Sequence, residues 1–320
     1  MADKKMLFIY NPKSGKAQIR SYLSDILEVF AKADYEVTIY PTQKRGDATE
    51  LTAYRKPVYD LVVCSGGDGT LDEVVTGMMK SSFMTPIGYI PAGSTNDFGG
   101  SLHLPKNMVQ AAETIVNCRN FPCDAGIFND DIFVYIAAFG LFTDVSYETA
   151  QDMKNVLGHM AYLLEGMKRL STIRSYHMKV TYEKWNEGKS SSGGIGENTA
   201  NDAPVRETAV IEDEFMFGMI TNSESVGGFK RITGRNVKLD DGVFEVTLIK
   251  RPRTAMELNE IMTALLNKEI DTKAIHCFKT SRLTVESEEE IAWTLDGEFG
   301  GTHQKVDIEN RCRAIDIRVK

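Results

Sequence analysis

The glycine-rich segment of residues 66–70, Gly-Gly-Asp-Gly-Thr, is the feature that most constrains the fold of this chain. It directly follows the apolar run of residues 61–64, and a helical pattern begins at Leu71. Glycines let backbone N–H groups approach an anion closely, and a helix N-terminus adds partial positive charge, so this arrangement suits a phosphate. Asp68 places a carboxylate in the same turn, which makes sense if a divalent metal lies between it and polyphosphate. The segment therefore favours nucleotide chemistry.

Strand and helix patterns alternate through the first 124 residues. The pattern predicts strands at residues 5–10, 35–40, 61–64 and 86–90, and helices at residues 18–32, 47–55, 71–79 and 107–116. Such alternation predicts an α/β fold with a doubly wound parallel sheet covered on both faces. Ligands of these sheets lie at the carboxyl ends of the strands. Three polar loops, residues 11–15, 66–70 and 91–97, fall there.

The pattern changes after residue 124, and we expect a second, β-rich domain over residues 125–304. Strands are predicted at residues 132–141, 177–182, 214–220, 243–249 and 282–285, with helical segments at 153–170 and 256–266. Residues 187–208 are rich in Ser, Gly, Asn and Asp, which cannot bury a core, so this segment is predicted to be a flexible insertion. Whether residues 305–320 return to the first domain stays open.

Charge and cysteine content narrow the class of protein. The net charge of −8 argues against a general nucleic-acid binder. The five cysteines are scattered without a C-x-x-C pair, which favours a reducing cytoplasm over a disulfide framework. The longest uncharged apolar run, residues 132–142, is shorter than the roughly 20 residues that span a bilayer. We expect no signal peptide, because no h-region follows the first residues.

Two further loops each have a plain structural interpretation. Residues 91–97, Pro-Ala-Gly-Ser-Thr-Asn-Asp, could be a turn that caps the next helix, or Asp97 could meet Asp68 across the crevice. Residues 11–16, Asn-Pro-Lys-Ser-Gly-Lys, lack the first glycine of a P-loop, so they are either a capped turn or a polar wall of a nucleotide pocket.

Five motifs in order resemble the diacylglycerol kinase catalytic family, and more narrowly its soluble bacterial lipid kinases. They begin at Asn11, Gly66, Pro91, Lys238 and Leu295, and the last reads Leu-Asp-Gly-Glu-Phe-Gly. The resemblance implies an ATP-binding α/β domain like that of NAD kinase and phosphofructokinase, and a C-terminal β-sandwich-like domain. It also implies a kinase that uses ATP and Mg²⁺ to phosphorylate the hydroxyl of diacylglycerol, giving phosphatidic acid.

The resemblance also assigns residues to the nucleotide. By matching motif, ATP would be lined by Asn11, Pro12, Lys13, Ser14, Gly15, Thr42, Gly66, Gly67, Asp68, Gly69, Thr70, Leu71, Asp72 and Ser94. The family usually has Thr where Ser94 stands, and the hydroxyl is kept. Asp68 and Asp97 would organise the metal and charge network, with one Mg²⁺ arriving with ATP near Asp68.

Two late motifs admit both a structural and a functional interpretation. Asp296-Gly297-Glu298 reads as a β-turn, or as the place where a carboxylate takes the acceptor's hydroxyl proton. The resemblance implies Glu298 as that base with Asp296 beside it, and the choice between them stays open. Residues 238–242 read as a hairpin turn. The resemblance adds a second Mg²⁺ site there, formed by the Asp241 side chain and the carbonyls of Lys238 and Val243.

A lipid acceptor requires contact with a membrane. Because an anionic membrane repels a chain with a net charge of −8, we expect a locally basic segment to make this contact. Residues 153–179 contain the basic residues Lys154, Lys168, Arg169, Arg174 and Lys179 against one acid, Glu165. Apolar residues recur at helical spacing over residues 153–170, which indicates a core helix or a helix at the membrane surface. We expect a cytoplasmic protein that associates transiently with membrane, and a homodimer stays open.

The sequence leaves three alternative functions open. The first is a kinase of the same family with another acceptor, a sphingoid base or phosphatidylglycerol. The second is a NAD kinase, which shares Gly-Gly-Asp-Gly but not the motifs beginning at Pro91 and Leu295. The third is a non-catalytic nucleotide-sensing module.

Overall fold

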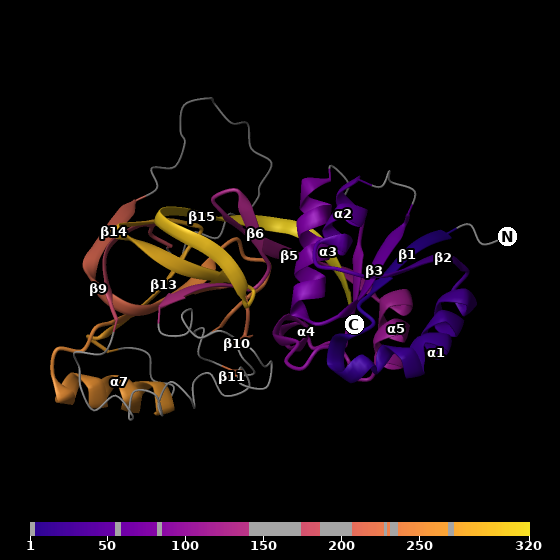
Figure 1. Ribbon diagram of the computed structural model, residues 1–320, viewed down its shortest axis with the longest axis horizontal. Helices are drawn as coiled ribbons and strands as arrows, with labels where there is room; N and C mark the ends of the chain where they lie inside the picture. The colour runs from indigo at the N-terminus through magenta and orange to yellow at the C-terminus, as the bar shows by residue number, and fades with distance from the viewer. Residues whose placement is uncertain are drawn as a thin grey trace, which may run out of the picture.

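Two regions lie side by side in the computed structural model, one built of strands and helices and one mostly of strands (Figure 1). The structure describes residues 4–54, 59–81, 85–140, 174–185, 207–226, 229–230, 236–267 and 272–320. Much of the predicted insertion 187–208 and all of the predicted helix 153–170 lie outside the described residues.

The α/β region contains four parallel strands in the order β2-β1-β3-β4. These are β1 (Lys4–Tyr10), β2 (Tyr35–Pro41), β3 (Leu61–Gly66) and β4 (Ile87–Pro91). The connecting helices are α1 (Ile19–Lys32), α2 (Asp47–Tyr54), α3 (Asp68–Lys80), α4 (Asp97–Ser101) and α5 (Met108–Asn117), with a short 3₁₀ helix η1 (Ser14–Ala17) before α1.

Strand β1 shows why both faces of this sheet are covered. Alternate residues point to opposite faces, and all of Met6, Leu7, Phe8 and Ile9 are buried. Met6 and Phe8 pack in one cluster with residues of α1 and α5, whereas Leu7 and Ile9 pack in another with residues of α3. The doubly wound arrangement follows from this continuous apolar run.

The second region is an antiparallel array. Its strands are β6 (Asp131–Phe133), β7 (Ile136–Gly140), β8 (Tyr176–Glu183), β9 (Thr208–Thr221), β12 (Phe244–Lys250), β13 (Ile275–Thr280) and β14 (Arg282–Leu295). Helix α7 (Ala255–Asn267) connects β12 to β13, and β10 (Ser225–Val226) pairs with β11 (Phe229–Lys230). The buried Trp293 lies at the centre of its core, with the rings of Phe128 and Phe139 packed edge-on against it.

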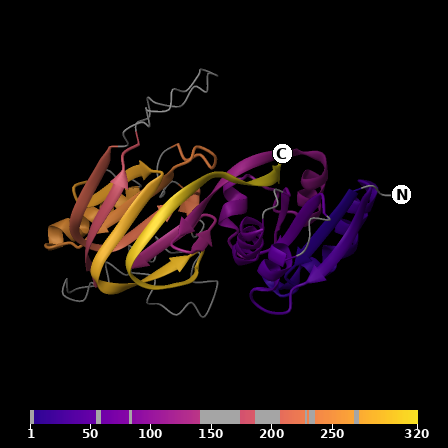
Figure 2. The same cartoon turned by 90° about the horizontal axis from the view of Figure 1, so that it is seen from above.

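Strand β15 (Glu298–Val319) joins the two regions into one sheet (Figure 2). It pairs with β14 in the second region, with β5 (Arg119–Phe128) along its later half, and with β4 through Ile317 and Ile87. The register against β5 shifts between Arg311 and Ile315, where Arg313 has a φ of 53°. The Asp124 carboxylate accepts a hydrogen bond from the Arg313 N–H at 2.8 Å, which stabilises this bulge.

The structure corrects one predicted strand. Residues 132–141 were expected to form a single strand, but the run is broken between β6 and β7. The N–H groups of Val134, Tyr135 and Ile136 donate to the Asp296 side chain rather than to a neighbouring strand. The break is therefore imposed by a residue 160 positions away, which no local pattern reveals.

Candidate active site

The loops that follow β1, β3 and β4 meet at one edge of the parallel sheet. The Asn11 N–H donates to the Ser65 carbonyl at 2.9 Å, and the Ala92 N–H donates to the Gly66 carbonyl at 2.7 Å. A Cβ placed on Gly93 would lie 2.5 Å from the Gly67 Cα, and one on Gly15 would lie 1.7 Å from the Ala92 oxygen. Only glycine fits at these contacts, so the three glycine-containing loops determine one another's positions.

A cleft of about 690 Å³ opens over this edge. It is lined by Asn11, Lys13, Ser14, Gly15, Thr42, Gln43, Lys44, Arg45, Gly67, Gly69, Thr70, Asp72, Glu73, Gly93, Ser94 and Glu298. The structure thus brings together most of the residues assigned to the nucleotide, and adds Glu298 from the far end of the sequence.

Some predicted residues lie behind the cleft, and some lining residues were not predicted. Gly66 and Leu71 are buried, and neither they nor Pro12 and Asp68 line the cleft. The unpredicted lining residues are Gln43, Lys44, Arg45, Glu73 and Gly93. Residues 44–46 read Lys-Arg-Gly and follow a predicted strand closely. This basic pair before a glycine is the sequence signal that could have identified Gln43, Lys44 and Arg45 as lining residues.

Helix α3 begins at Asp68, three residues earlier than its apolar pattern predicts. Gly67 stands at its N-cap, and no side-chain hydrogen bond caps this end. The N-terminal end of α3 therefore has no capping side-chain acceptor, and the helix dipole adds partial positive charge there. This end of α3 can bind an anion such as phosphate.

Asp68 lies where the loops after β3 and β4 touch. Its Oδ2 accepts a hydrogen bond from the Asp97 N–H at 3.1 Å, while its buried Oδ1 has no hydrogen-bond partner. Burial, followed by the charge of Asp97, raises the pKa of Asp68 from 3.8 to about 7. The carboxylate is destabilised as it stands and suits a bound cation.

Asp296 is buried, and its side chain accepts hydrogen bonds from three backbone N–H groups. Its Oδ2 accepts from the Val134 N–H at 2.5 Å, and its Oδ1 accepts from the N–H groups of Tyr135 and Ile136 at 3.0 and 2.9 Å. These three donors oppose the effect of burial on its pKa, which is nevertheless raised. Asp72 faces it, and burial followed by the Asp296 charge raises the pKa of Asp72 well above its usual value. A protonated Asp72 can therefore donate to Asp296.

Glu298, two residues later, is different. Its side chain is 55% exposed and lines the cleft, and its Oε2 lies 3.2 Å from Nη1 of Arg45. Of the two carboxyls in the Asp-Gly-Glu motif, Glu298 can reach a molecule in the cleft, whereas Asp296 is committed to backbone N–H groups.

Asp97 links the two regions instead of lining the cleft. It is 2% exposed, and its Oδ1 accepts a hydrogen bond from the Ser225 hydroxyl at 3.0 Å. The buried hydroxyls of Ser101 and Ser223, 2.9 Å apart, add a second link between α4 and the segment before β10. Asp97 thus meets Asp68 through its backbone and the second region through its side chain.

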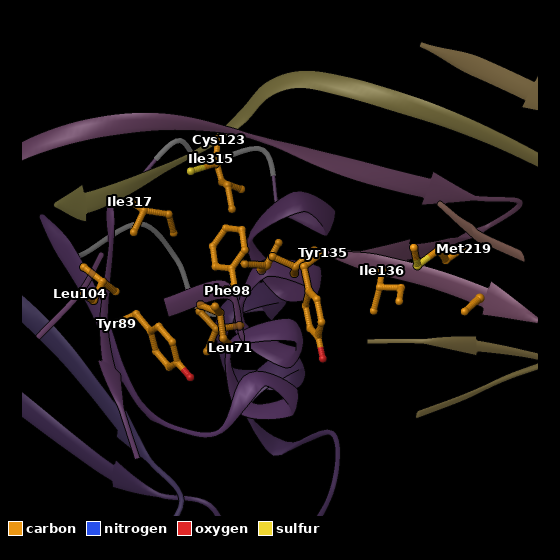
Figure 3. Close-up of a cluster of buried hydrophobic side chains, with 14 of the residues drawn as sticks. Leu71, Tyr89, Phe98, Leu104, Cys123, Tyr135, Ile136, Met219, Ile315 and Ile317 are labelled. Atoms are coloured by element: carbon orange, nitrogen blue, oxygen red, sulfur yellow. The ribbon is translucent and has the colours of Figure 1, made fainter. Parts of the chain in front are cut away.

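Tyrosine side chains complete the interior behind the cleft. Figure 3 shows Leu71 and Phe98 between Tyr89 and Tyr135. The Tyr89 hydroxyl lies 3.2 Å from both the Gly66 carbonyl and Asn96 Oδ1. Burial, followed by the charges of nearby aspartates, raises the pKa of both tyrosines, which keeps their hydroxyls protonated.

The residues expected to hold a second Mg²⁺ lie apart from this cleft. The Asp241 Oδ1 accepts from the Val243 N–H at 3.3 Å, and its Oδ2 lies 3.6 Å from the Lys279 ammonium. Lys279 also pairs with Glu245 at 3.1 Å, and burial raises the pKa of Glu245 to about 7. Asp241 and Glu245 offer carboxylate oxygens here, and oxygen donors of this kind fit Mg²⁺.

Helix α3 offers a second set of oxygen donors. Asp68 Oδ1 and Asp72 Oδ1 are buried carboxylate oxygens without hydrogen-bond partners. One helical turn separates the two residues on α3. Such oxygens fit Mg²⁺, although no group of three or more His, Cys, Asp and Glu side chains within the described ranges is arranged to hold a metal by itself. Further ligands would have to come from phosphate and water.

Comparison with known proteins places this geometry in a family. Residues 5–127 match the model of the diacylglycerol kinase catalytic domain. The chain is 32% identical over 302 residues to the diacylglycerol kinase of Bacillus subtilis strain 168, covering 93% of this chain and 91% of that protein. It is also 32% identical over 317 residues to the diacylglycerol kinase of a Staphylococcus aureus strain, covering 98% and 92%.

The fold has a solved counterpart. The crystal structure of a diacylglycerol kinase from Bacillus anthracis strain Sterne superposes with a TM-score of 0.76 at 26% sequence identity, covering 99% of this chain and 97% of that one. Across the described part of the chain, none of the helices has the length and apolar character needed to span a bilayer.

Proposed function

Because the chain belongs to the diacylglycerol kinase family and is a lipid kinase, we propose that it transfers the γ-phosphoryl group of ATP to the hydroxyl of diacylglycerol and forms phosphatidic acid. The observation that carries this proposal is the cleft itself. A helix N-terminus, three glycine-containing loops and an accessible carboxylate, Glu298, line one space. A phosphoryl-transfer enzyme requires anion binding and a group that accepts the hydroxyl proton.

In this proposal ATP lies over the carboxyl ends of β1, β3 and β4. The N–H groups at the start of α3 and the hydroxyls of Ser14, Thr70 and Ser94 bind the phosphates. Asp68, with Asp72 nearby, would hold Mg²⁺, which when bound would supply charge neutralisation at the phosphates. Asp97 holds the loop of Asp68 against the second region.

Glu298 is the proposed proton acceptor for the lipid hydroxyl. It is exposed in the cleft, in contrast to Asp296, whose oxygens already accept three backbone hydrogen bonds. Asp296 is then a positioning residue, which holds the segment of residues 134–136 and the turn that carries Glu298. Asp241, with the carbonyls of Lys238 and Val243, is the proposed ligand set of a structural Mg²⁺.

The two regions receive different roles. Residues 1–124 would be an ATP-binding domain like that of NAD kinase and phosphofructokinase, and residues 125–304 a β-sandwich-like lipid-substrate domain. The pairing of β15 with β4 and β5 supports a return of residues 305–320 to the first domain. A cytoplasmic protein that reaches membrane transiently follows from the lipid acceptor.

The test is a transfer assay with each candidate lipid alone. Purified protein is mixed with radiolabelled ATP, Mg²⁺ and micelles that contain diacylglycerol, a sphingoid base or phosphatidylglycerol. Label in phosphatidic acid with diacylglycerol supports the proposal. Label with another lipid alone changes the acceptor and keeps the mechanism. ATP binding without label in any lipid overturns the proposal in favour of a nucleotide-sensing module.

A further inference from the structure

Arg45 connects the two regions across the cleft. It lies in the loop between β2 and α2, and its Nη1 is 3.2 Å from Oε2 of Glu298 at the start of β15. Both side chains line the cleft, and they are 74% and 55% exposed. An ion pair between groups this exposed contributes little to stability, so another strong partner can replace it easily.

The loop that carries Arg45 is built to hold its backbone in place. The Asp47 Oδ2 accepts from the N–H groups of Gln43 and Lys44 at 2.7 and 3.0 Å, and these bonds lower the pKa of Asp47. On the other side of Arg45, Glu73 accepts from the Gly46 N–H at 2.9 Å. Two carboxylates therefore flank Arg45 and fix the loop, while its own side chain extends into the cleft.

The acidic residues that line the cleft differ in their hydrogen-bond and ion-pair partners. Glu73 is engaged by the N–H groups of Gly46 and Ala48. Glu298 is the carboxylate that faces Arg45. A triphosphate in the same cleft offers Arg45 a multiply charged anion with bidentate geometry, which binds guanidinium more strongly than one exposed carboxylate does.

We propose that Arg45 is a positioning residue that changes partner: it pairs with Glu298 across the cleft and moves to the phosphates of ATP when ATP binds, releasing Glu298 for the acceptor. This inference rests on the proposed function. In the step that follows, the acceptor O–H bond breaks and its proton passes to a Glu298 oxygen as the acceptor oxygen bonds to the γ-phosphorus. The bond from the γ-phosphorus to the bridging oxygen breaks, and its electron pair leaves with ADP.

The first experiment measures binding without any acceptor lipid. The affinity for the non-hydrolysable analogue AMP-PNP with Mg²⁺ is determined by calorimetry for the wild type, Arg45→Met, Glu298→Gln and the double variant. Glu298→Gln frees Arg45 for the phosphates. This substitution should therefore tighten AMP-PNP binding at least threefold more when Arg45 is present than when Arg45 is replaced by Met. Equal tightening in both backgrounds overturns the exchange of partners.

The second experiment separates binding from turnover. Arg45→Met should weaken nucleotide binding about tenfold with little change in kcat at saturating ATP, because Glu298 is then never held by the ion pair, and Arg45→Lys should recover part of the binding. Arg251→Met is the control, because Arg251 also pairs with a carboxylate, that of Glu214 at 3.3 Å, but lies outside the cleft, and it should leave both values unchanged. An Arg45→Met variant that behaves like Arg251→Met overturns the inference. Failure of the wild type to label any lipid would instead count against the proposed function.

Discussion

At the scale of single residues, the carboxyls around the cleft differ in environment more than in type. Asp68 and Asp72 each have one buried oxygen without a partner, Asp296 is saturated by backbone N–H groups, and Glu298 is exposed. Burial disfavours the charged form, whereas hydrogen bonds from backbone N–H groups favour it. The same functional group is therefore suited to metal binding, to positioning or to proton transfer according to what surrounds it.

The raised pKa of Asp68 has a consequence for stability. Its folded pKa of about 7 lies above its ordinary value of 3.8, so the stability that this group contributes is complete below about pH 4 and is lost as pH rises through 7. Asp68→Asn removes this loss and should stabilise the metal-free protein by on the order of 2–4 kcal/mol at pH 8, and by much less at pH 5, while abolishing transfer. Chemical denaturation at both pH values in EDTA measures this. Equal effects at pH 5 and pH 8 would contradict it.

Substitutions of the two carboxyls of the Asp-Gly-Glu motif should have different effects, one on turnover and the other on stability. Glu298→Gln should lower kcat by about 10²-fold or more with little change in melting temperature, because an exposed side chain is altered. Asp296→Asn should destabilise the fold by about 1–3 kcal/mol, because an amide NH₂ would then face backbone donors. Thermal unfolding and single-turnover assays on both variants measure this. A fully active Glu298→Gln would remove that residue from the mechanism.

At the scale of elements, the site is a set of loops whose positions depend on one another. The strands β1, β3 and β4 end at the same edge, and the loops after them approach so closely that glycines face glycines. Such contacts tolerate no added atoms, since the neighbour is backbone and cannot rotate away. The geometry of the nucleotide site is therefore sensitive to side chains that would never touch a ligand.

Gly93→Ala tests this dependence. Its Cβ would lie 2.5 Å from the Gly67 Cα, so the loops after β3 and β4 should separate, at a cost of about 1–3 kcal/mol, and nucleotide affinity should fall at least tenfold. Gly100→Ala is the control, because no atom lies within 4 Å of its added Cβ. Calorimetry with AMP-PNP and thermal unfolding provide the readouts. Unchanged affinity in Gly93→Ala would show that the loops do not constrain each other.

At the scale of the whole molecule, β15 is the connection that matters most. It begins at Glu298 in the cleft, continues through the second region, and ends paired with β4 and β5 (Figure 2). The hydroxyl contacts between Ser225 and Asp97 and between Ser101 and Ser223 hold the regions together at a second place. The cleft thus depends on residues from both ends of the chain.

Ile317→Ala tests the contribution of the C-terminal strand. The side chain is fully buried against both neighbouring strands, so its truncation should lower the free energy of unfolding by about 2–5 kcal/mol. Ile39→Ala on the edge strand β2, where the residue is 41% exposed, should cost much less. Urea denaturation followed by circular dichroism compares the two. Similar midpoints for both variants would mean that β15 is dispensable to the α/β region.

Local signals in the sequence determined the parallel strands, their connecting helices and the glycine-rich loops at one edge, because apolar periodicity and turn chemistry act over a few residues. They also predicted that Asp68 and Asp97 meet, since both follow adjacent strands of one sheet. Only the tertiary structure decided the rest. The break between β6 and β7, the saturation of Asp296, and the contact of Arg45 with Glu298 each join residues more than 150 positions apart. No local sequence pattern predicts such a contact, because the contact forms only when the whole sheet has assembled.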